Sequence, residues 1–286
     1  MSTNTSVFKA VFNDTKWSDD FFRFLQVVFH LYPEDKFHCL IADETAVNET
    51  DEQIYKSIQA KLPTIKPFLS ELTYALPALK KQKKEIVREM RELLGDVKQI
   101  NGYAEIGSTG RYISQLKKEV KITGPVYLIN DLAPTNSPAD IMERGQIGKL
   151  GTFVDINGYE PISSDVIADN SLDLLTCNIG LHHCPVSKLP GFVKSIHRII
   201  RPGGAFIIRD HNVTTPQMAD FVSLVHTVFN AGLKESWQFE TKDFKNFKPV
   251  EEWSAMITKA GFKDAGKRIL QDNDPSDNTL MLFTKI

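Results

Sequence analysis

The sequence has 286 residues, enough for one large domain or for a core domain with a substantial additional lobe. Its hydrophobic content of 42%, charged content of 24% and net charge of -2 are ordinary for a globular enzyme and argue against a protein that holds nucleic acid by general electrostatics. Three cysteines fit neither a disulfide framework nor a metal pattern, and no signal peptide or membrane-spanning run is recognisable, so we expect a cytoplasmic protein.

The first hundred residues carry helical patterns. A helix capped by Ser18 is expected to end before Pro33, because apolar residues recur there at helical spacing. A capping box at Thr50 and Gln53 predicts the start of a second helix. A third helix, with lysines on a polar stretch, is expected over 77–94. These patterns predict an N-terminal helical lobe.

After Gly102 the pattern changes to alternating strands and helices. Five short apolar strands are expected, over 103–106, 126–130, 151–154, 172–177 and 205–209. Helices are expected between them, over 111–120, 139–144 and 188–200. This alternation predicts a doubly wound α/β fold with a parallel sheet. The tail differs, since a helix over 251–260 precedes two strands, 267–271 and 280–284, joined by a hairpin loop.

Two features follow the first two strands of this pattern. The run Glu105–Arg111 contains Gly107 and Gly110, which would let the backbone approach a ligand at the start of a helix. Asp131 ends the next strand, where a carboxylate can accept hydrogen bonds from ribose hydroxyls. A tight turn and a capping aspartate are the alternative interpretations of each feature taken alone. Together they favour a nucleoside ligand.

From Gly102 onward the sequence resembles the class I S-adenosyl-L-methionine (SAM)-dependent methyltransferases, in particular their small-molecule, ubiquinone-methyltransferase-like type. The motifs that carry this resemblance are Tyr103–Gly107, Tyr127–Asp131, Ser171–His183 and Ile196–Ile208. The Leu-His-His turn and the Arg-Pro-Gly-Gly strand entry in the last two are the most specific. The resemblance implies a seven-stranded Rossmann-like sheet with an antiparallel last strand, and SAM as the cofactor.

The resemblance also assigns the methionine end of SAM to the glycine loop. Glu105 and Gly107 would hold that end, while the backbone of Ser108, Thr109 and Gly110 would approach the cofactor. The family often has glycines where Thr109 and its second neighbour Arg111 stand here. The loop is therefore either one residue shorter or follows a different path.

The remaining cofactor contacts fall on the loops after later strands. By resemblance, Asp131 would accept the ribose hydroxyls and Leu132 would pack on the adenine. Asp155 would accept the adenine amino group while Ile156 covers a face of the ring. The floor beneath the sulfonium would be lined by Asn178 and Ile179.

The candidate catalytic residues are His183, Asp210 and His211. Methyl transfer is an in-line displacement, so a base is needed only if the nucleophile must lose a proton. His182 and His183 follow the fourth strand and would also suit a structural role. Arg209-Asp210-His211 would suit either a substrate-polarising cluster or a salt-bridged turn. We expect no metal, because adjacent histidines cannot readily share one ion.

We therefore expect a SAM-dependent methyltransferase that acts on a small-molecule acceptor. Residues 1–100 would form the helical lobe and residues 101–286 the methyltransferase domain, with a cap insertion at about 212–249. One alternative is a SAM-binding fold with a degenerate site that serves as a regulatory or interaction subunit. Methylation of a protein or nucleic acid is a further alternative, which the acidic balance disfavours for nucleic acid. The sequence does not indicate the oligomeric state.

Overall fold

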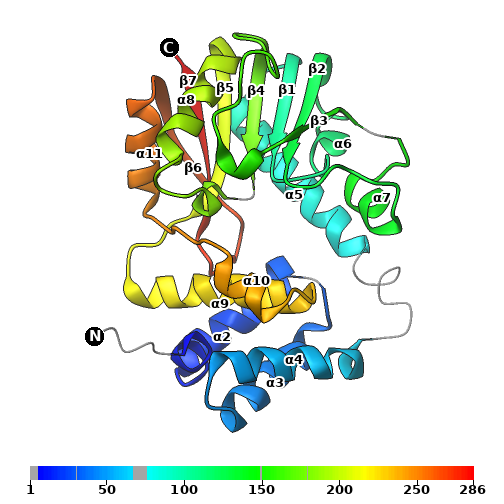
Figure 1. Ribbon diagram of the computed structural model, residues 1–286, viewed down its shortest axis with the longest axis vertical. Helices are drawn as coiled ribbons and strands as arrows, with labels where there is room; N and C mark the ends of the chain where they lie inside the picture. Colours follow the sequence, from blue (N-terminus) through cyan, green and yellow to red (C-terminus); the bar gives the residue numbers. More distant parts are fainter. Residues whose placement is uncertain (1–5, 30, 67–75, 149, 179) are drawn as a thin grey trace. The chain divides into compact units, whose positions relative to one another are not determined.

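The computed structural model describes residues 6–29, 31–66, 76–148, 150–178 and 180–286. The chain divides into two compact units (Figure 1). The helical unit comprises Met1–Lys80, His211–Phe247 and Gln271–Asn278. The sheet unit comprises Lys81–Asp210, Lys248–Leu270 and Thr279–Ile286. This division differs from the expected boundary at residue 100, because the expected cap insertion joins the N-terminal helices while 81–100 belong with the sheet.

The sheet unit contains the seven-stranded sheet that the sequence predicts. In chain order its strands are β1 (Gln99–Ile106), β2 (Lys121–Asn130), β3 (Thr152–Asp155), β4 (Leu172–Cys177), β5 (Ile200–His211), β6 (Phe262–Leu270) and β7 (Asn278–Lys285). Their spatial order is β3-β2-β1-β4-β5-β7-β6. The first five strands pair in parallel, whereas β6 and β7 are antiparallel. The strand order reverses next to β1, which is where a doubly wound sheet binds its ligand.

Helices cover both faces of this sheet (Figure 1). Side chains alternate along a strand, so Ala104 and Ile106 face one layer while Tyr103 faces the other. The first layer is formed by α8 (Leu189–Ile199) and α11 (Val250–Lys259), and the second by α5 (Leu76–Leu94) and α6 (Ile113–Leu116). Fully buried side chains such as Phe192 and Trp253 each contribute about 1.5 to 3 kcal/mol to this packing.

Several elements differ in length from their prediction. The expected helix over 111–120 is wrong in extent, because only Ile113–Leu116 is α-helical. The fifth strand is longer than the expected 205–209, since β5 begins at Ile200 and includes the Pro202-Gly203-Gly204 segment. A shift in register accommodates that segment: Leu172 pairs with Ile200 and Leu174 pairs with Ala205. Extra residues in one strand are absorbed by such a bulge.

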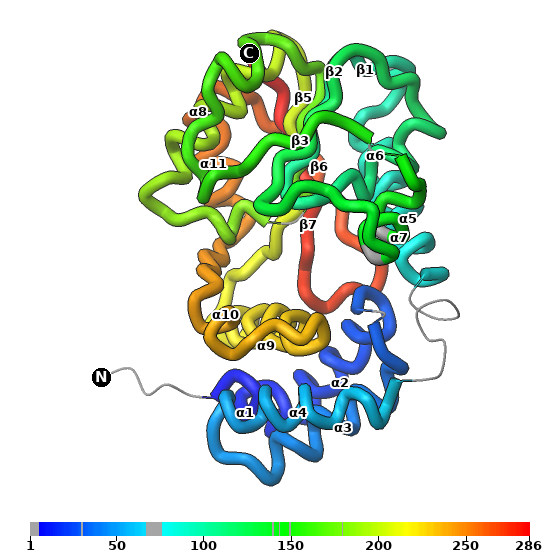
Figure 2. Tube along the Cα trace, turned by 45° about the vertical axis from the view of Figure 1, so that its right-hand side comes forward, coloured from blue at the N-terminus to red at the C-terminus, as the bar shows by residue number. Residues whose placement is uncertain are grey.

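The helical unit has its own apolar core. It is built from α1 (Val7–Phe12), α2 (Thr15–Phe24), a π-helix (Leu25–Phe29), α3 (Glu34–Val47), α4 (Asp51–Ile65), α9 (Pro216–Gly232) and α10 (Trp237–Lys242). Within this unit α9 packs against α1 and α4 (Figure 2). Phe21, Phe37 and Phe221 are fully buried there and form part of this core.

The caps of these helices confirm one prediction and correct another. Thr50 and Gln53 form the predicted capping box of α4. The first long helix begins earlier than expected, because Asp14 and not Ser18 caps α2, accepting the Trp17 amide at 3.1 Å. Among the helices that the structure describes, none combines the length and the apolar character required to cross a bilayer.

Candidate cofactor and active site

The candidate site lies at the carboxyl edge of the parallel strands. Ile106 of β1 pairs with Cys177 of β4, and Asn130 of β2 pairs with Asp155 of β3. The loops that follow these strands therefore begin side by side at one edge of the sheet. This arrangement brings together most of the residues expected to hold the cofactor, namely those that follow β1, β2, β3 and β4: Gly107, Ser108, Thr109, Gly110, Asp131, Leu132, Asp155, Ile156 and Asn178.

The glycine loop after β1 is organised around the hydroxyl of Ser108. This hydroxyl accepts the amides of Gly110 at 3.1 Å and Arg111 at 3.0 Å, and it donates to Glu105. Gly110 has a φ of +102°, and a β-carbon there would lie 3.0 Å from Leu150 Cδ1, so this position favours glycine. The loop follows a different path from a run of alternating glycines, because a side-chain hydroxyl holds its amides.

Glu105 is fully buried, and both oxygens of its carboxylate accept hydrogen bonds from neighbouring residues. One carboxylate oxygen accepts the Tyr112 amide at 3.2 Å, and the other accepts the Ile113 amide at 3.1 Å and the Tyr103 hydroxyl at 2.8 Å. Burial raises the pKa of Glu105, while the hydrogen bonds from Ser108, Tyr103 and the two amides act in the opposite direction. The structure thus gives Glu105 a role in holding the loop, and direct contact with methionine stays a prediction.

Two carboxylates stand at the ends of neighbouring strands. Asp131 follows β2, and Asp155 ends β3 and accepts the Asn157 amide at 2.7 Å. Desolvation raises the pKa of Asp131, the charge of Asp155 raises it further, and His183 lowers it. A carboxylate pair at this edge is ready to accept hydrogen bonds from the hydroxyl and amino groups of a nucleoside.

The apolar residues expected to hold the adenine have contrasting environments. Leu132 is 75% exposed, so its side chain is open to solvent at the end of β2. Ile156 is 3% exposed and belongs to the core that packs against α8. Ile179, expected to line the floor beneath the sulfonium, lies outside the described residues.

Two buried polar atoms at this edge have no hydrogen-bond partner among the described residues. They are the hydroxyl of Thr109 and the side-chain oxygen Oδ1 of Asn178. Thr109 is 8% exposed and Asn178 is 6% exposed. A buried polar atom without a partner is costly, so such atoms call for a ligand or water. Together with the two carboxylates, they make a donor and acceptor set that fits the polar groups of SAM.

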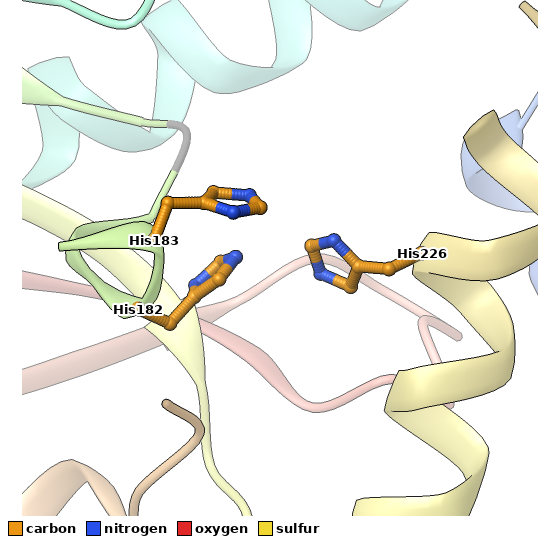
Figure 3. A group of neighbouring side chains, drawn as sticks. All are labelled: His182, His183 and His226. Carbon is orange, nitrogen blue, oxygen red and sulfur yellow. The ribbon is translucent and has the colours of Figure 1, made fainter. Parts of the chain in front are cut away.

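The turn after β4 carries a buried pair of residues. His182 lies in the 3₁₀ turn Leu181–His183, and its Nδ1 lies 2.8 Å from Oδ1 of Asp210, at the end of β5. The same carboxylate accepts the His182 amide at 3.3 Å. Figure 3 shows the rings of His182 and His183 projecting from this turn, with ring centroids 4.3 Å apart. The structure therefore pairs Asp210 with His182, a residue outside the three candidate catalytic residues His183, Asp210 and His211.

The other residues of the Arg209-Asp210-His211 run have different surroundings. Arg209 is 4% exposed, and its charge lowers the pKa of Glu85 on α5 after the larger effect of Arg88. His211 is 5% exposed and donates from Nδ1 to the carbonyl of Ser276 at 2.8 Å. These hydrogen bonds of Asp210 and His211 therefore lead to different parts of the chain, the turn after β4 and the loop between β6 and β7.

Sequence reasoning missed a fully buried arginine in the segment between β2 and β3. Arg144 is 0% exposed and ends α7 (Pro138–Arg144). Its guanidinium donates to the carbonyls of Gln146 at 2.9 Å and Ile147 at 2.7 Å, to the side chain of Asn136 at 3.0 Å and to the carbonyl of Thr135. These bonds hold the segment that follows Asp131. The role of Arg144 in holding this segment is visible only from the backbone carbonyls that surround it, and a sequence does not show these carbonyls.

Comparisons with known proteins agree with this geometry. A family model described as a methyltransferase domain matches residues 140–208. The 2-methoxy-6-polyprenyl-1,4-benzoquinol methylase of Schizosaccharomyces pombe is 27% identical over 112 residues, covering 36% of this chain and 36% of that protein. The ubiquinone/menaquinone biosynthesis C-methyltransferase of Rickettsia akari is 26% identical over 157 residues, covering 49% of this chain and 61% of that protein. The chain thus spans less than two thirds of each relative's length.

A solved structure shares the fold. It is an O-methyltransferase family protein from Burkholderia thailandensis, with a TM-score of 0.50 and 13% identity, covering 100% of this chain and 74% of that one. At this identity the likeness shows the fold alone. The strand order, the motifs at the carboxyl edge and the methyltransferase domain match agree. In its fold and in the segment 140–208, the chain is similar to the class I SAM-dependent methyltransferases.

Proposed function

We propose that this protein transfers the methyl group of SAM to a small-molecule acceptor. The observation that carries the proposal is the carboxyl edge of the sheet, which carries Asp131 and Asp155 as well as the buried polar atoms of Thr109 and Asn178 that have no partner among the described residues. The similarity to SAM-dependent methyltransferases supports SAM as the ligand. The polar, partly desolvated edge of the sheet supports the same cofactor.

Each residue at this edge would contact a different part of the cofactor. Asp131 would accept the ribose hydroxyls, and Asp155 would accept the adenine amino group beside the apolar Leu132 and Ile156. Thr109 and Asn178 would meet polar groups of the methionine end, since both have buried atoms to satisfy. SAM supplies an electrophilic methyl group when it is bound. The chain's part is to place the acceptor against that group and to exclude water.

The class of acceptor is supported by the relatives. One relative is named as a benzoquinol methylase and the other as a ubiquinone/menaquinone biosynthesis C-methyltransferase. A benzoquinol is a small molecule, so a small molecule is the class that we propose here.

Two measurements test this function. Isothermal titration of the purified protein with SAM and with S-adenosylhomocysteine should give saturable heat. Release of S-adenosylhomocysteine should then depend on an added acceptor, drawn from a panel of phenols, hydroquinones and amines. Absence of heat and of any thermal stabilisation by SAM would refute the proposal.

A second candidate is a SAM-binding fold without turnover, serving an interaction role. One observation favours it: the amides of Gly110 and Arg111 are occupied by Ser108, and those of Tyr112 and Ile113 by Glu105. A helix start at which these four amides are occupied internally offers less to a ligand carboxylate. Saturable SAM binding without turnover on any acceptor of the panel would favour this candidate.

A further inference from the structure

The segment between β2 and β3 has a charged side chain at its centre. We call residues 131–148 the β2–β3 excursion. Among the described side chains from Thr135 to Gly148, Arg144 alone is buried, and it is 0% exposed. The packing of buried apolar side chains therefore contributes little to holding these residues together. A buried charge is costly unless it is hydrogen-bonded, so the guanidinium requires the acceptors that surround it.

The acceptors of Arg144 lie on both sides of α7. Its guanidinium donates to the carbonyl of Thr135 and to the side chain of Asn136 at 3.0 Å, both before the helix. It also donates to the carbonyls of Gln146 at 2.9 Å and Ile147 at 2.7 Å, both after the helix. A planar guanidinium has donors that diverge and can bridge two stretches of chain, whereas a lysine ammonium presents its donors from a single point. Arg144 therefore closes the excursion into a loop.

Both ends of this loop border residues that are expected to hold the cofactor. The first end begins with Asp131 and Leu132, and the carbonyl of Leu132 accepts the Asn130 side chain at 3.3 Å. The other end leads to Leu150, which is 8% exposed and whose Cδ1 would lie 3.0 Å from a β-carbon placed on Gly110 of the glycine loop. A different path of the excursion would therefore displace the residues at its two ends.

We propose that Arg144 is a positioning residue for SAM. It holds the β2–β3 excursion in its binding conformation before the cofactor arrives, and so places Asp131 and Leu132 against the adenosine half. This inference rests on the proposed function, in which these two residues contact ribose and adenine. A segment that must become ordered on binding lowers the affinity, and a segment that is ordered beforehand avoids this cost. Because Arg144 acts through the excursion, it affects cofactor affinity and not the methyl transfer step.

Hydrogen exchange of the ligand-free protein tests this positioning without any cofactor. The conservative variant Arg144→Lys keeps the charge but cannot bridge the two stretches. Backbone amides of the excursion should therefore exchange about tenfold faster in R144K than in the wild type. Amides of β4 should exchange at the wild-type rate, because the excursion opens locally. Unchanged exchange in the excursion, or an equal acceleration in β4, would overturn the proposal.

The matched control is Arg198→Lys. Arg198 also donates to two backbone carbonyls, those of Ile167 at 3.1 Å and Ile162 at 2.7 Å, in the segment between β3 and β4. The stretch 162–167 carries no predicted cofactor contact. Calorimetry should give a Kd for S-adenosylhomocysteine that is raised about tenfold in R144K and stays within about twofold of the wild type in R198K. Equal losses in the two variants would contradict a specific role of Arg144.

The loss should concern the adenosine half and should be reversible. Methylthioadenosine, which lacks the amino acid end, should lose affinity for R144K by the same factor as S-adenosylhomocysteine. In Arg144→Ala, low millimolar guanidinium chloride should restore affinity, and sodium chloride at equal ionic strength should not, because the vacated space is lined by the same carbonyl oxygens. Circular dichroism establishes whether R144A is folded, and R144K provides the result if it is not. A loss confined to S-adenosylhomocysteine, or a folded R144A that guanidinium does not rescue, would contradict the proposal.

Turnover then separates this inference from the proposed function. On any acceptor that the wild type methylates, R144K should raise the KM for SAM about tenfold and leave kcat at saturating SAM within about twofold. A lower kcat with an unchanged KM would sink the positioning role alone. Absence of SAM binding by the wild type would instead sink the proposed function, while exchange rates measured without ligand would still show whether Arg144 closes the excursion.

Discussion

Ser108 donates a hydrogen bond from its hydroxyl to the carboxylate of Glu105, the fully buried acid at the end of β1. The same hydroxyl accepts the amides of Gly110 and Arg111. One side chain therefore joins the buried carboxylate to the turn that follows it. The path of the glycine loop depends on this pair.

Replacement of Ser108 by alanine should destabilise the protein and weaken SAM binding. The change leaves two amides without an acceptor and removes one donor from Glu105. Burial already disfavours the charged form of Glu105. A buried hydrogen bond lost in this way costs about 1 to 3 kcal/mol in unfolding free energy. Urea denaturation and calorimetry with SAM would measure both effects. The control is Ser114→Ala, whose hydroxyl makes a weaker contact at 3.4 Å with the Arg111 carbonyl; equal losses in the two variants would contradict this role of Ser108.

Asp131→Asn should weaken SAM binding and stabilise the protein without SAM. Hydrogen bonds to a charged group contribute about 1.5 to 3 kcal/mol, so loss of the carboxylate should raise the Kd for SAM roughly 10- to 150-fold. Burial and the charge of Asp155 raise the pKa of Asp131 above its ordinary 3.8. Its contribution to stability is therefore fully present below 3.8 and is lost as the pH rises through the folded-state pKa.

The raised pKa of Asp131 determines how the difference in unfolding free energy between D131N and the wild type changes with pH. The advantage of D131N in unfolding free energy over the wild type should be absent in acid and should grow as the pH rises above 3.8, up to a plateau. Thermal melts of both proteins across this range would measure it. Asp165→Asn is the control, since Asp165 is an exposed residue between β3 and β4. A SAM affinity of D131N close to that of the wild type would refute the ribose assignment.

Much of the sheet unit is predictable from sequence because its signals are local. The run 172–177 matches β4 as a largely apolar segment, and the paired strands at the end follow from two apolar runs around a polar loop. The helix over 111–120 fails for a physical reason. Tyr112 and Ile113 donate their amides to Glu105, so the chain enters only four residues of α-helix after that turn.

The sequence predicts where the residues of the candidate site lie, but it does not predict which of them contact one another. The end of a parallel strand places Asp131 and Asn178 at one edge whatever their neighbours are. Which histidine Asp210 contacts depends on how the turn after β4 folds, and there the deciding residue is Gly180, whose lack of a side chain has no periodic signal. The two-unit division likewise depends on contacts between segments far apart in the sequence.

The cysteines should differ sharply in reactivity. Cys39 is exposed, whereas Cys177 and Cys184 are buried. Burial raises the pKa of the Cys184 thiol to about 12, so the reactive thiolate is scarce at neutral pH. Iodoacetamide added to the folded protein should therefore label Cys39 alone, and all three cysteines should label in urea. Mass spectrometry of the peptides would measure this; rapid labelling of Cys184 in the folded protein would contradict the burial seen here.

The last prediction concerns the bulge in β6. Both carboxylate oxygens of Asp264 accept hydrogen bonds from the Arg268 guanidinium, at 2.9 and 2.7 Å, and one of them also accepts the Gly266 amide at 2.7 Å. The register between β6 and β7 shifts in this segment. These partners, Arg268 first, lower the pKa of Asp264 to about 2. A group with a lowered pKa contributes stability that is present above its ordinary 3.8 and is lost as the pH falls toward 2.

Asp264→Asn should therefore lower the free energy of unfolding at neutral pH by about 1 to 2 kcal/mol, a value reduced for solvent screening of a partly exposed pair. The loss should shrink between pH 3.8 and about 2, because the wild type loses the same interaction there. Urea denaturation at several pH values would measure this difference. Glu251→Gln is the matched control, since Glu251 is 80% exposed and lies 3.9 Å from Arg268. A deficit of the Asp264 variant that stays constant down to pH 2 would show that the asparagine disturbs the bulge itself and that the ion pair contributes little.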